Sequence, residues 1–142
     1  MSIAKTNCRE TVPLKKGIAD YVKAYRTLKD FGDYVTLNIS CPNAFGGQPF
    51  TDGKKLDALL KEIDKIKNEK PIFLKLSADL SPAEIDAITD VSRTHRITGF
   101  ICTNLTKNRN NTKIIEKDVP DKGGLSGKAV EESSNRMISY IH

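Results

Sequence analysis

Short apolar runs alternate with amphipathic stretches along this chain, and that alternation restricts the folds open to it. Apolar runs of strand length occupy residues 34–39, 71–76 and 97–102. Hydrophobic residues spaced three and four apart, as on one face of a helix, occupy residues 17–31, 56–66 and 81–91. Strands separated by helices of this length predict an α/β fold with βα units and a parallel sheet.

Three further signals complete this pattern. A strand is expected to end near Lys5, and a last helix to begin at about Lys128. Ser81-Pro82-Ala83-Glu84 fits a capping box with Pro in the first helical turn, so a helix is expected to begin there. No linker interrupts the 142 residues, which predicts one domain over 1–142.

The charge distribution argues against nucleic acid as a partner. Lys and Arg total 23 against 18 Asp and Glu, which gives a net charge of +5. In the most charged segment, residues 54–70, basic and acidic side chains alternate, which is typical of a solvated helix face. Aromatic residues make up 6% of the chain and do not interleave with basic ones, as single-strand binders require.

The cysteine count and the hydropathy favour a reduced, intracellular setting. Cys8, Cys41 and Cys102 form no CxxC pair, and two histidines accompany them, so no metal site is expected. No stretch approaches the ~20 apolar residues that span a bilayer, and the first residues lack the apolar core of a secretory signal. We expect a cytoplasmic protein, with peripheral membrane attachment through a segment outside this sequence as the alternative.

Polar residues gather where each predicted strand ends. The first strand runs into Asn38-Ile39-Ser40-Cys41-Pro42-Asn43, the second carries Lys75 near its end, and the third ends in Thr103-Asn104. In parallel α/β folds, ligands bind at the carboxyl ends of the strands. The sequence therefore predicts a ligand site at that edge of the sheet.

Structural interpretations of the same residues are open at this point. Lys75 could be a charged residue that protects an edge strand. Asn38 and Asn43 could cap turns around Pro42, and Cys41 could be an inert small residue, although it follows a strand end in a polar loop. The glycines of segment 123–127 are only a weak phosphate signal, because the P-loop lysine is missing.

Four segments together resemble the FMN-dependent dihydroorotate dehydrogenase family. They are NISCPN at 38–43, FLKL at 73–76, TNLT at 103–106 and GGLSG at 123–127, and they occur in the family's order and spacing. The resemblance implies a (β/α)8 TIM barrel, of which this chain supplies about half, from the middle of the barrel. It also implies oxidation of (S)-dihydroorotate to orotate in pyrimidine biosynthesis.

The resemblance assigns a role to each matching residue. Cys41 stands at the position of the catalytic base that removes the C5 proton while the C6 hydride passes to FMN. Asn38 would contact both flavin and substrate. The other implied flavin contacts are Lys5, Lys75, Thr103 and Gly127, and the other implied substrate contacts are Asn43, Asn104 and Leu105, which stands where Thr is common.

The resemblance also implies partners. Dihydroorotate and orotate are the expected substrate and product. Quinone, fumarate or NAD is the expected electron acceptor, with quinone favoured because segments 103–109 and 123–134 look closer to the quinone-reducing class, although Cys41 is typical of the cytosolic classes. A second copy of the chain or the remainder of the barrel is expected to complete the fold, and alone the chain is expected to bind FMN weakly or not at all.

Two other functions stay open from the sequence. One is an FMN barrel of the dihydropyrimidine or dihydrouridine type, which would not need to recognise the carboxylate of orotate. The other is a non-catalytic fragment that binds nucleic acid or protein.

Overall fold

A single parallel sheet organises the computed structural model, which describes residues 1–41, 44–116 and 118–142. The strand order follows the chain order, so that each strand pairs in parallel with the next one along the sequence. This is the order of a barrel segment, with no reversal of the kind that doubly wound sheets have. The strands are β1 (Ser2–Ala4), β2 (Val35–Asn38), β3 (Ile72–Lys75) and β4 (Gly99–Ile101).

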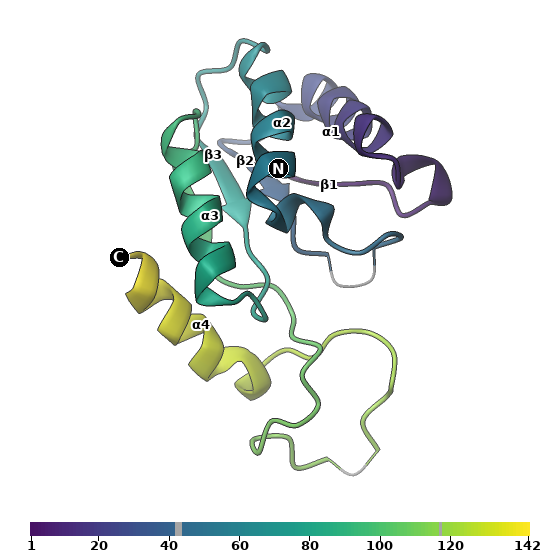
Figure 1. Ribbon diagram of the computed structural model, residues 1–142, viewed down its shortest axis with the longest axis vertical. Coiled ribbons are helices and arrows are strands. Elements are labelled where there is room, and N and C mark those ends of the chain that lie inside the picture. The colour runs from purple at the N-terminus through teal and green to yellow at the C-terminus, as the bar shows by residue number, and fades with distance from the viewer. Residues whose placement is uncertain (42–43, 117) are drawn as a thin grey trace.

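The helices connect consecutive strands, and the predicted order of strands and helices is confirmed. In Figure 1, α2 lies between α1 and α3, and α4 follows a long connection from β4. The two short 3-10 helices were not predicted, because three residues carry no periodicity. The helical elements are η1 (Arg9–Thr11), α1 (Leu14–Leu28), η2 (Pro49–Thr51), α2 (Gly53–Asp64), α3 (Pro82–Arg93) and α4 (Lys128–Ile141).

The strands alternate between a face packed on helices and a face left for other contacts. Leu37 of β2 and Leu74 of β3 are fully buried in the core, together with Leu56, Leu59 and Leu60 of α2. Because strand side chains alternate, the neighbours of these leucines point to the opposite face of the sheet. That second face carries the polar residues at the carboxyl ends of the strands.

The predicted capping box sets the start of α3 just beyond β3. The Ser81 hydroxyl accepts a hydrogen bond from the Glu84 N–H at 3.4 Å, and the Ser81 N–H donates to Glu84 Oε2 at 2.8 Å. With Pro82 at the first position, the helix start is fixed by the local sequence. The turn between β3 and α3 therefore stays short.

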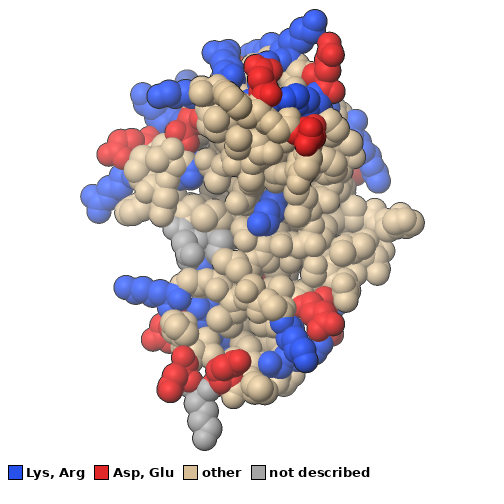
Figure 2. All heavy atoms as spheres, turned by 180° about the vertical axis from the view of Figure 1, so that it is seen from behind, with Lys and Arg blue, Asp and Glu red and all other residues tan. Residues whose placement is uncertain are grey.

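The surface seen from behind carries charges of both signs. Figure 2 shows blue and red side chains intermixed toward the upper and lower parts of that view, with a largely uncharged middle. Such mixing is typical of a solvated surface. Within the described residues, no helix is long and apolar enough to cross a membrane.

Candidate functional site

Strand register places two of the predicted site residues side by side. Asn38 of β2 pairs with Lys75 of β3, and Lys75 pairs with Ile101 of β4. Asn38 and Lys75 therefore lie on the same face at the carboxyl edge of the sheet. Because β3 has a strand on each side, the interpretation of Lys75 as the guard of an edge strand is wrong.

Two polar groups at this edge have hydrogen-bonding capacity to spare. Among the described residues, nothing accepts a hydrogen bond from the Lys75 ammonium, and the buried hydroxyl of Thr103 has no hydrogen-bond partner. Buried polar groups are nearly always hydrogen-bonded, so the Thr103 hydroxyl has room for a partner such as a water or a ligand. These residues fit a polar cofactor such as a flavin.

Two thiols, Cys41 and Cys102, come after strands at this edge. Cys41 lies three residues beyond the end of β2, is partly buried, and lines a small cavity with Asn38 and Tyr21. The other two thiols differ: Cys8 contacts the Thr11 hydroxyl at 3.8 Å, and burial raises the pKa of Cys102. Within the described part of the chain, no cluster of three His, Cys, Asp or Glu side chains could hold a metal ion.

A pair of side chains after β1 holds the loop that follows Cys41. Lys5 Nζ donates to the Phe45 carbonyl at 3.0 Å, and Asn7 Oδ1 accepts from the Phe45 N–H at 2.6 Å. Lys5 also donates to Thr11 Oγ1 at 2.9 Å and to the Thr6 carbonyl at 3.3 Å. All three ammonium hydrogens thus have acceptors within the chain, and the implied contact of Lys5 with a flavin stays a prediction.

Asn104 reaches across the sheet to the segment that carries Cys41. Its Nδ2 donates to the Ser40 carbonyl at 3.0 Å and to Ser40 Oγ at 3.1 Å, and its Oδ1 accepts from the Leu105 N–H. Leu105 packs on Gly124, where a Cβ would lie 2.5 Å from the Leu105 Cβ. The glycine segment is therefore held close to the end of β4.

The rest of the connection between β4 and α4 is pinned from two sides. Thr106 forms an antiparallel bridge with Leu125, and the Asp79 carboxylate accepts from the Thr106 hydroxyl and from the Lys107 N–H. Gly127 directly precedes α4 as its N-cap and has a φ of 69°, a conformation that favours glycine. Its implied role at the flavin stays a prediction.

Part of the turn-capping interpretation of the asparagines is confirmed. Asn38 Oδ1 accepts from the Ser40 N–H at 3.3 Å and from Ser40 Oγ at 2.8 Å, as an Asx turn does. Asn38 therefore caps a turn and also lies at the carboxyl edge of the sheet. Asn43 lies outside the described residues.

Three contributors to the site were not predicted: Ser40, Asn7 and Tyr21. Ser40 lies inside the NISCPN motif, but nothing in the sequence indicated that its side chain links two strand ends. The buried Tyr21 hydroxyl donates to the Asn38 carbonyl at 2.8 Å, and burial strongly raises the pKa of this phenol. A polar tip on an otherwise apolar helix face is the one signal that would have indicated Tyr21.

The strand order and the polar carboxyl edge place this chain in the class of parallel α/β barrels, which bind their ligands at that edge. Comparison with known protein families narrows the assignment from this class to one family. The family model described as dihydroorotate dehydrogenase matches residues 2–142, so the chain belongs to the dihydroorotate dehydrogenase family.

Relatives with known names agree with this assignment. The chain is 32% identical over 139 residues to a dihydroorotate dehydrogenase (quinone) of Synechococcus sp. (strain JA-3-3Ab), covering 94% of this chain and 37% of the relative. It is 37% identical over 130 residues to that of Myxococcus xanthus (strain DK1622), covering 89% and 35%. The structure of DHODH from Eimeria tenella in complex with ferulenol has the same fold, with a TM-score of 0.78 at 23% identity over 88% of this chain and 39% of that one.

The shared region is only part of each relative. This chain spans less than two fifths of the length of the curated relatives above and of the Eimeria structure. The predicted fold, part of a TIM barrel, is confirmed by that structural likeness.

Proposed function

We propose that this chain carries the catalytic edge of an enzyme that oxidises dihydroorotate to orotate with FMN in pyrimidine biosynthesis. The observation that carries the proposal is the gathering of Asn38, Lys75 and Asn104 at one sheet edge beside Cys41. Family membership supports the choice of substrate. The other side chains of the edge supply donors and acceptors suited to a flat, polar ring.

The residues present fit FMN. Lys75 and Thr103 would hold the isoalloxazine ring, because each has a donor without a partner among the described residues. Gly127 would allow close approach of the backbone, since a Cβ there would meet open space. When bound, FMN would accept the hydride that leaves C6 of the substrate. The Lys75 cation would stabilise negative charge that develops on the ring.

Cys41 is proposed as the base that removes the C5 proton. A proton next to a carbonyl needs a positioned base, and such help is worth about 10²–10⁴ in rate. A free thiol titrates near pH 8.5, far closer to neutrality than a serine hydroxyl. Partial exposure at the strand end leaves Cys41 accessible to a substrate lying on the edge.

Quinone is the proposed electron acceptor. The relatives from Synechococcus and Myxococcus are both named for it. None of the edge residues described above is proposed to contact the acceptor. Fumarate and NAD are the alternatives, and acceptor-dependent turnover separates the three.

The test is turnover of dihydroorotate by the complete native protein loaded with FMN. With a soluble quinone as acceptor, we expect orotate formation, and a loss of about 10²–10⁴ in kcat for Cys41→Ala. Cys41→Ser should keep part of the activity, and the pH at which turnover rises should be higher than in the wild type. Cys8→Ala, a thiol outside the edge, is the matched control and should leave turnover unchanged.

Two results would overturn the proposal. Full turnover in Cys41→Ala would exclude this thiol as the base. Oxidation of 5,6-dihydrouracil in place of dihydroorotate would instead favour the dihydropyrimidine type of FMN barrel, whose substrate lacks the carboxylate.

A further inference from the structure

A buried serine links the two amides of the candidate site. Ser40 has no exposed surface, and it lies directly before Cys41. Its hydroxyl is 2.8 Å from Asn38 Oδ1 and 3.1 Å from Asn104 Nδ2. Since β3 separates β2 from β4 in the sheet, Ser40 bridges two strand ends that do not pair with each other.

Backbone groups fix which way each amide faces. The Ser40 N–H can only donate, so the Asn38 atom 3.3 Å from it is the oxygen. The Ser40 carbonyl can only accept, so the Asn104 atom 3.0 Å from it is the nitrogen. The Leu105 N–H, 2.9 Å from Asn104, likewise requires the amide oxygen on that side. The Ser40 hydroxyl must then accept from Asn104 and donate to Asn38.

We propose that Ser40 is a positioning residue that sets the hydrogen-bonding polarity of the site. The Asn38 oxygen accepts from Ser40, and no acceptor for Asn38 Nδ2 is found among the described residues. Asn104 Nδ2 donates to two acceptors of Ser40, so Asn104 presents the remaining acceptor capacity of Oδ1. The matching ligand offers a carbonyl oxygen to Asn38 and an N–H to Asn104, as a cyclic imide or ureide does.

The proposal rests on the proposed function for the identity of the ring, which in dihydroorotate carries alternating carbonyl and N–H groups. Ser40→Ala removes only the hydroxyl, because the backbone bonds of residue 40 persist in any variant. Asn38 and Asn104 would then keep their hydrogen bonds to backbone groups of residue 40. They would lose the shared hydroxyl that restricts rotation of the two amide planes. The chemistry at Cys41 would be left in place.

Kinetics of the complete native protein with FMN give the first test. For Ser40→Ala we expect KM for dihydroorotate to rise about tenfold while kcat changes less than about threefold, the pattern of lost uniform binding. Ser77→Ala is the matched control, because Ser77 is a buried serine after the next strand and, within the described chain, its hydroxyl accepts only from the nearby Asp79 N–H. An equal KM in Ser40→Ala and Ser77→Ala would overturn the proposal.

Side-chain amide exchange measured by NMR gives a second test that needs no turnover. In the wild-type protein, the Nδ2 hydrogens of Asn104 should exchange with solvent more slowly than those of Asn38, and Ser40→Ala should speed the Asn104 exchange at least about threefold. Faster exchange at Asn104 than at Asn38 in the wild type would overturn the proposal. If dihydroorotate is not oxidised at all, the proposed function fails while this exchange test still decides the role of Ser40.

Discussion

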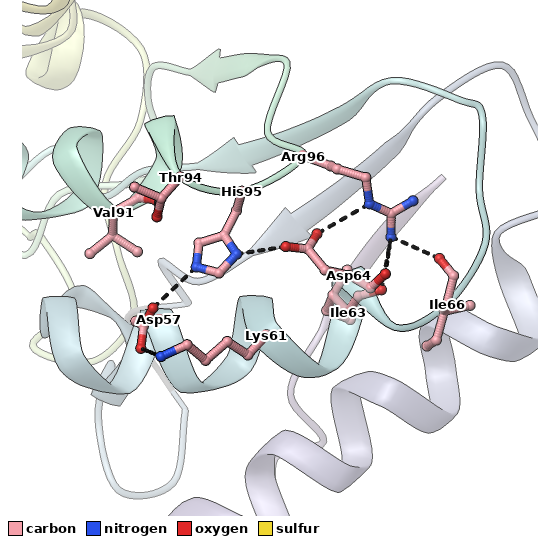
Figure 3. A network of polar contacts seen from close by, with 9 residues as sticks. All are labelled: Asp57, Lys61, Ile63, Asp64, Ile66, Val91, Thr94, His95 and Arg96. Carbon is pink, nitrogen blue, oxygen red and sulfur yellow. Dashed lines mark hydrogen bonds and ion pairs between the residues drawn. The ribbon is translucent and has the colours of Figure 1, made fainter.

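The two ends of the sheet are held by opposite kinds of polar chemistry. At the amino end, Asp57, Asp64, His95 and Arg96 form the amino-end network between α2 and the turn before β4 (Figure 3). The His95 side chain is 6% exposed and contacts Asp64 Oδ2 at 2.6 Å and Asp57 Oδ1 at 3.2 Å. Arg96 Nε adds an ion pair to Asp64 at 3.2 Å.

At the carboxyl end, neutral side chains link the ends of two strands. Asn38, Ser40 and Asn104 join β2 to β4 through amide and hydroxyl bonds alone. Charged groups at that end include Lys5 and Asp79, which bond to loop residues, and Lys75, whose ammonium has no hydrogen-bond acceptor among the described residues.

The difference between the two ends distinguishes a network that stabilises the fold from a site that can bind a ligand. In the amino-end network each side chain meets an opposite charge or a backbone carbonyl, so the network serves to hold the fold. At the carboxyl end, Lys75 and Thr103 keep donors that the described chain does not use. Buried donors without partners lower stability and are kept where a ligand completes them.

The largest expected effect on stability is at the amino end, in Arg96→Met. Arg96 Nη2 lies within hydrogen-bond distance of the carbonyls of Ile63, Asp64 and Ile66, at 2.8–3.1 Å, where the chain leaves α2. Losing these charge-assisted bonds should lower the free energy of unfolding by about 2 kcal/mol. Urea unfolding measures this, and alkylation of Cys41 by iodoacetamide should keep its rate.

Arg93→Met is the matched control for that variant. Arg93 makes one exposed pair, to Asp90 at 3.4 Å, and its loss should cost less than about 0.5 kcal/mol. Equal destabilisation by the two substitutions, or a changed Cys41 alkylation rate in Arg96→Met, would mean that the two ends are not separate as argued.

At the carboxyl end, Tyr21→Phe should have a smaller effect. The substitution keeps the edge-on contact of the ring with Phe50, whose centroid is 5.3 Å away, and removes the hydrogen bond to the Asn38 carbonyl. The expected cost is about 1 kcal/mol in urea unfolding, with faster Cys41 alkylation because the end of β2 is less firmly held. Tyr34→Phe, at a ring 46% exposed, is the control and should change neither quantity.

Sequence patterns predicted the elements because each depends on local signals. The three- and four-residue spacing on α1 and α2 and the Ser81 capping box act within one element, and all of them agree with the structure. The placement of polar residues at the carboxyl edge was predictable as well, because parallel strands bring Asn38 and Lys75 to one edge whatever the details of packing.

What the sequence could not supply were contacts between side chains far apart in the chain. Asn7 lies 38 residues from Phe45, and Asn104 lies 64 residues from Ser40. Neither pairing follows from periodicity or motif, because each depends on how loops close over the sheet. No sequence pattern indicated that His95 would lie between two carboxylates of α2, because this contact forms only in the folded chain.

The smallest expected effect is the response of the amino end to acid. Hydrogen bonds from Lys61 and then from His95 hold the pKa of Asp57 below its usual range. A depressed folded pKa contributes stability that is present above the unfolded value of about 3.9 and is lost as pH falls through the folded value. Asp57→Asn should therefore melt below the wild type at pH 7, and the difference should shrink as the pH falls below about 4.

Thermal melts at a series of pH values between 7 and 2 measure that difference. Asp90→Asn, at a carboxylate with an exposed ion pair to Arg93, should show almost no difference at any pH. A gap between the wild type and Asp57→Asn that stays constant down to pH 2 would show that Asp57 acts through packing and not through its charge. In that case, the contrast between a charged end and a neutral end would have to rest on Arg96 and Asp64.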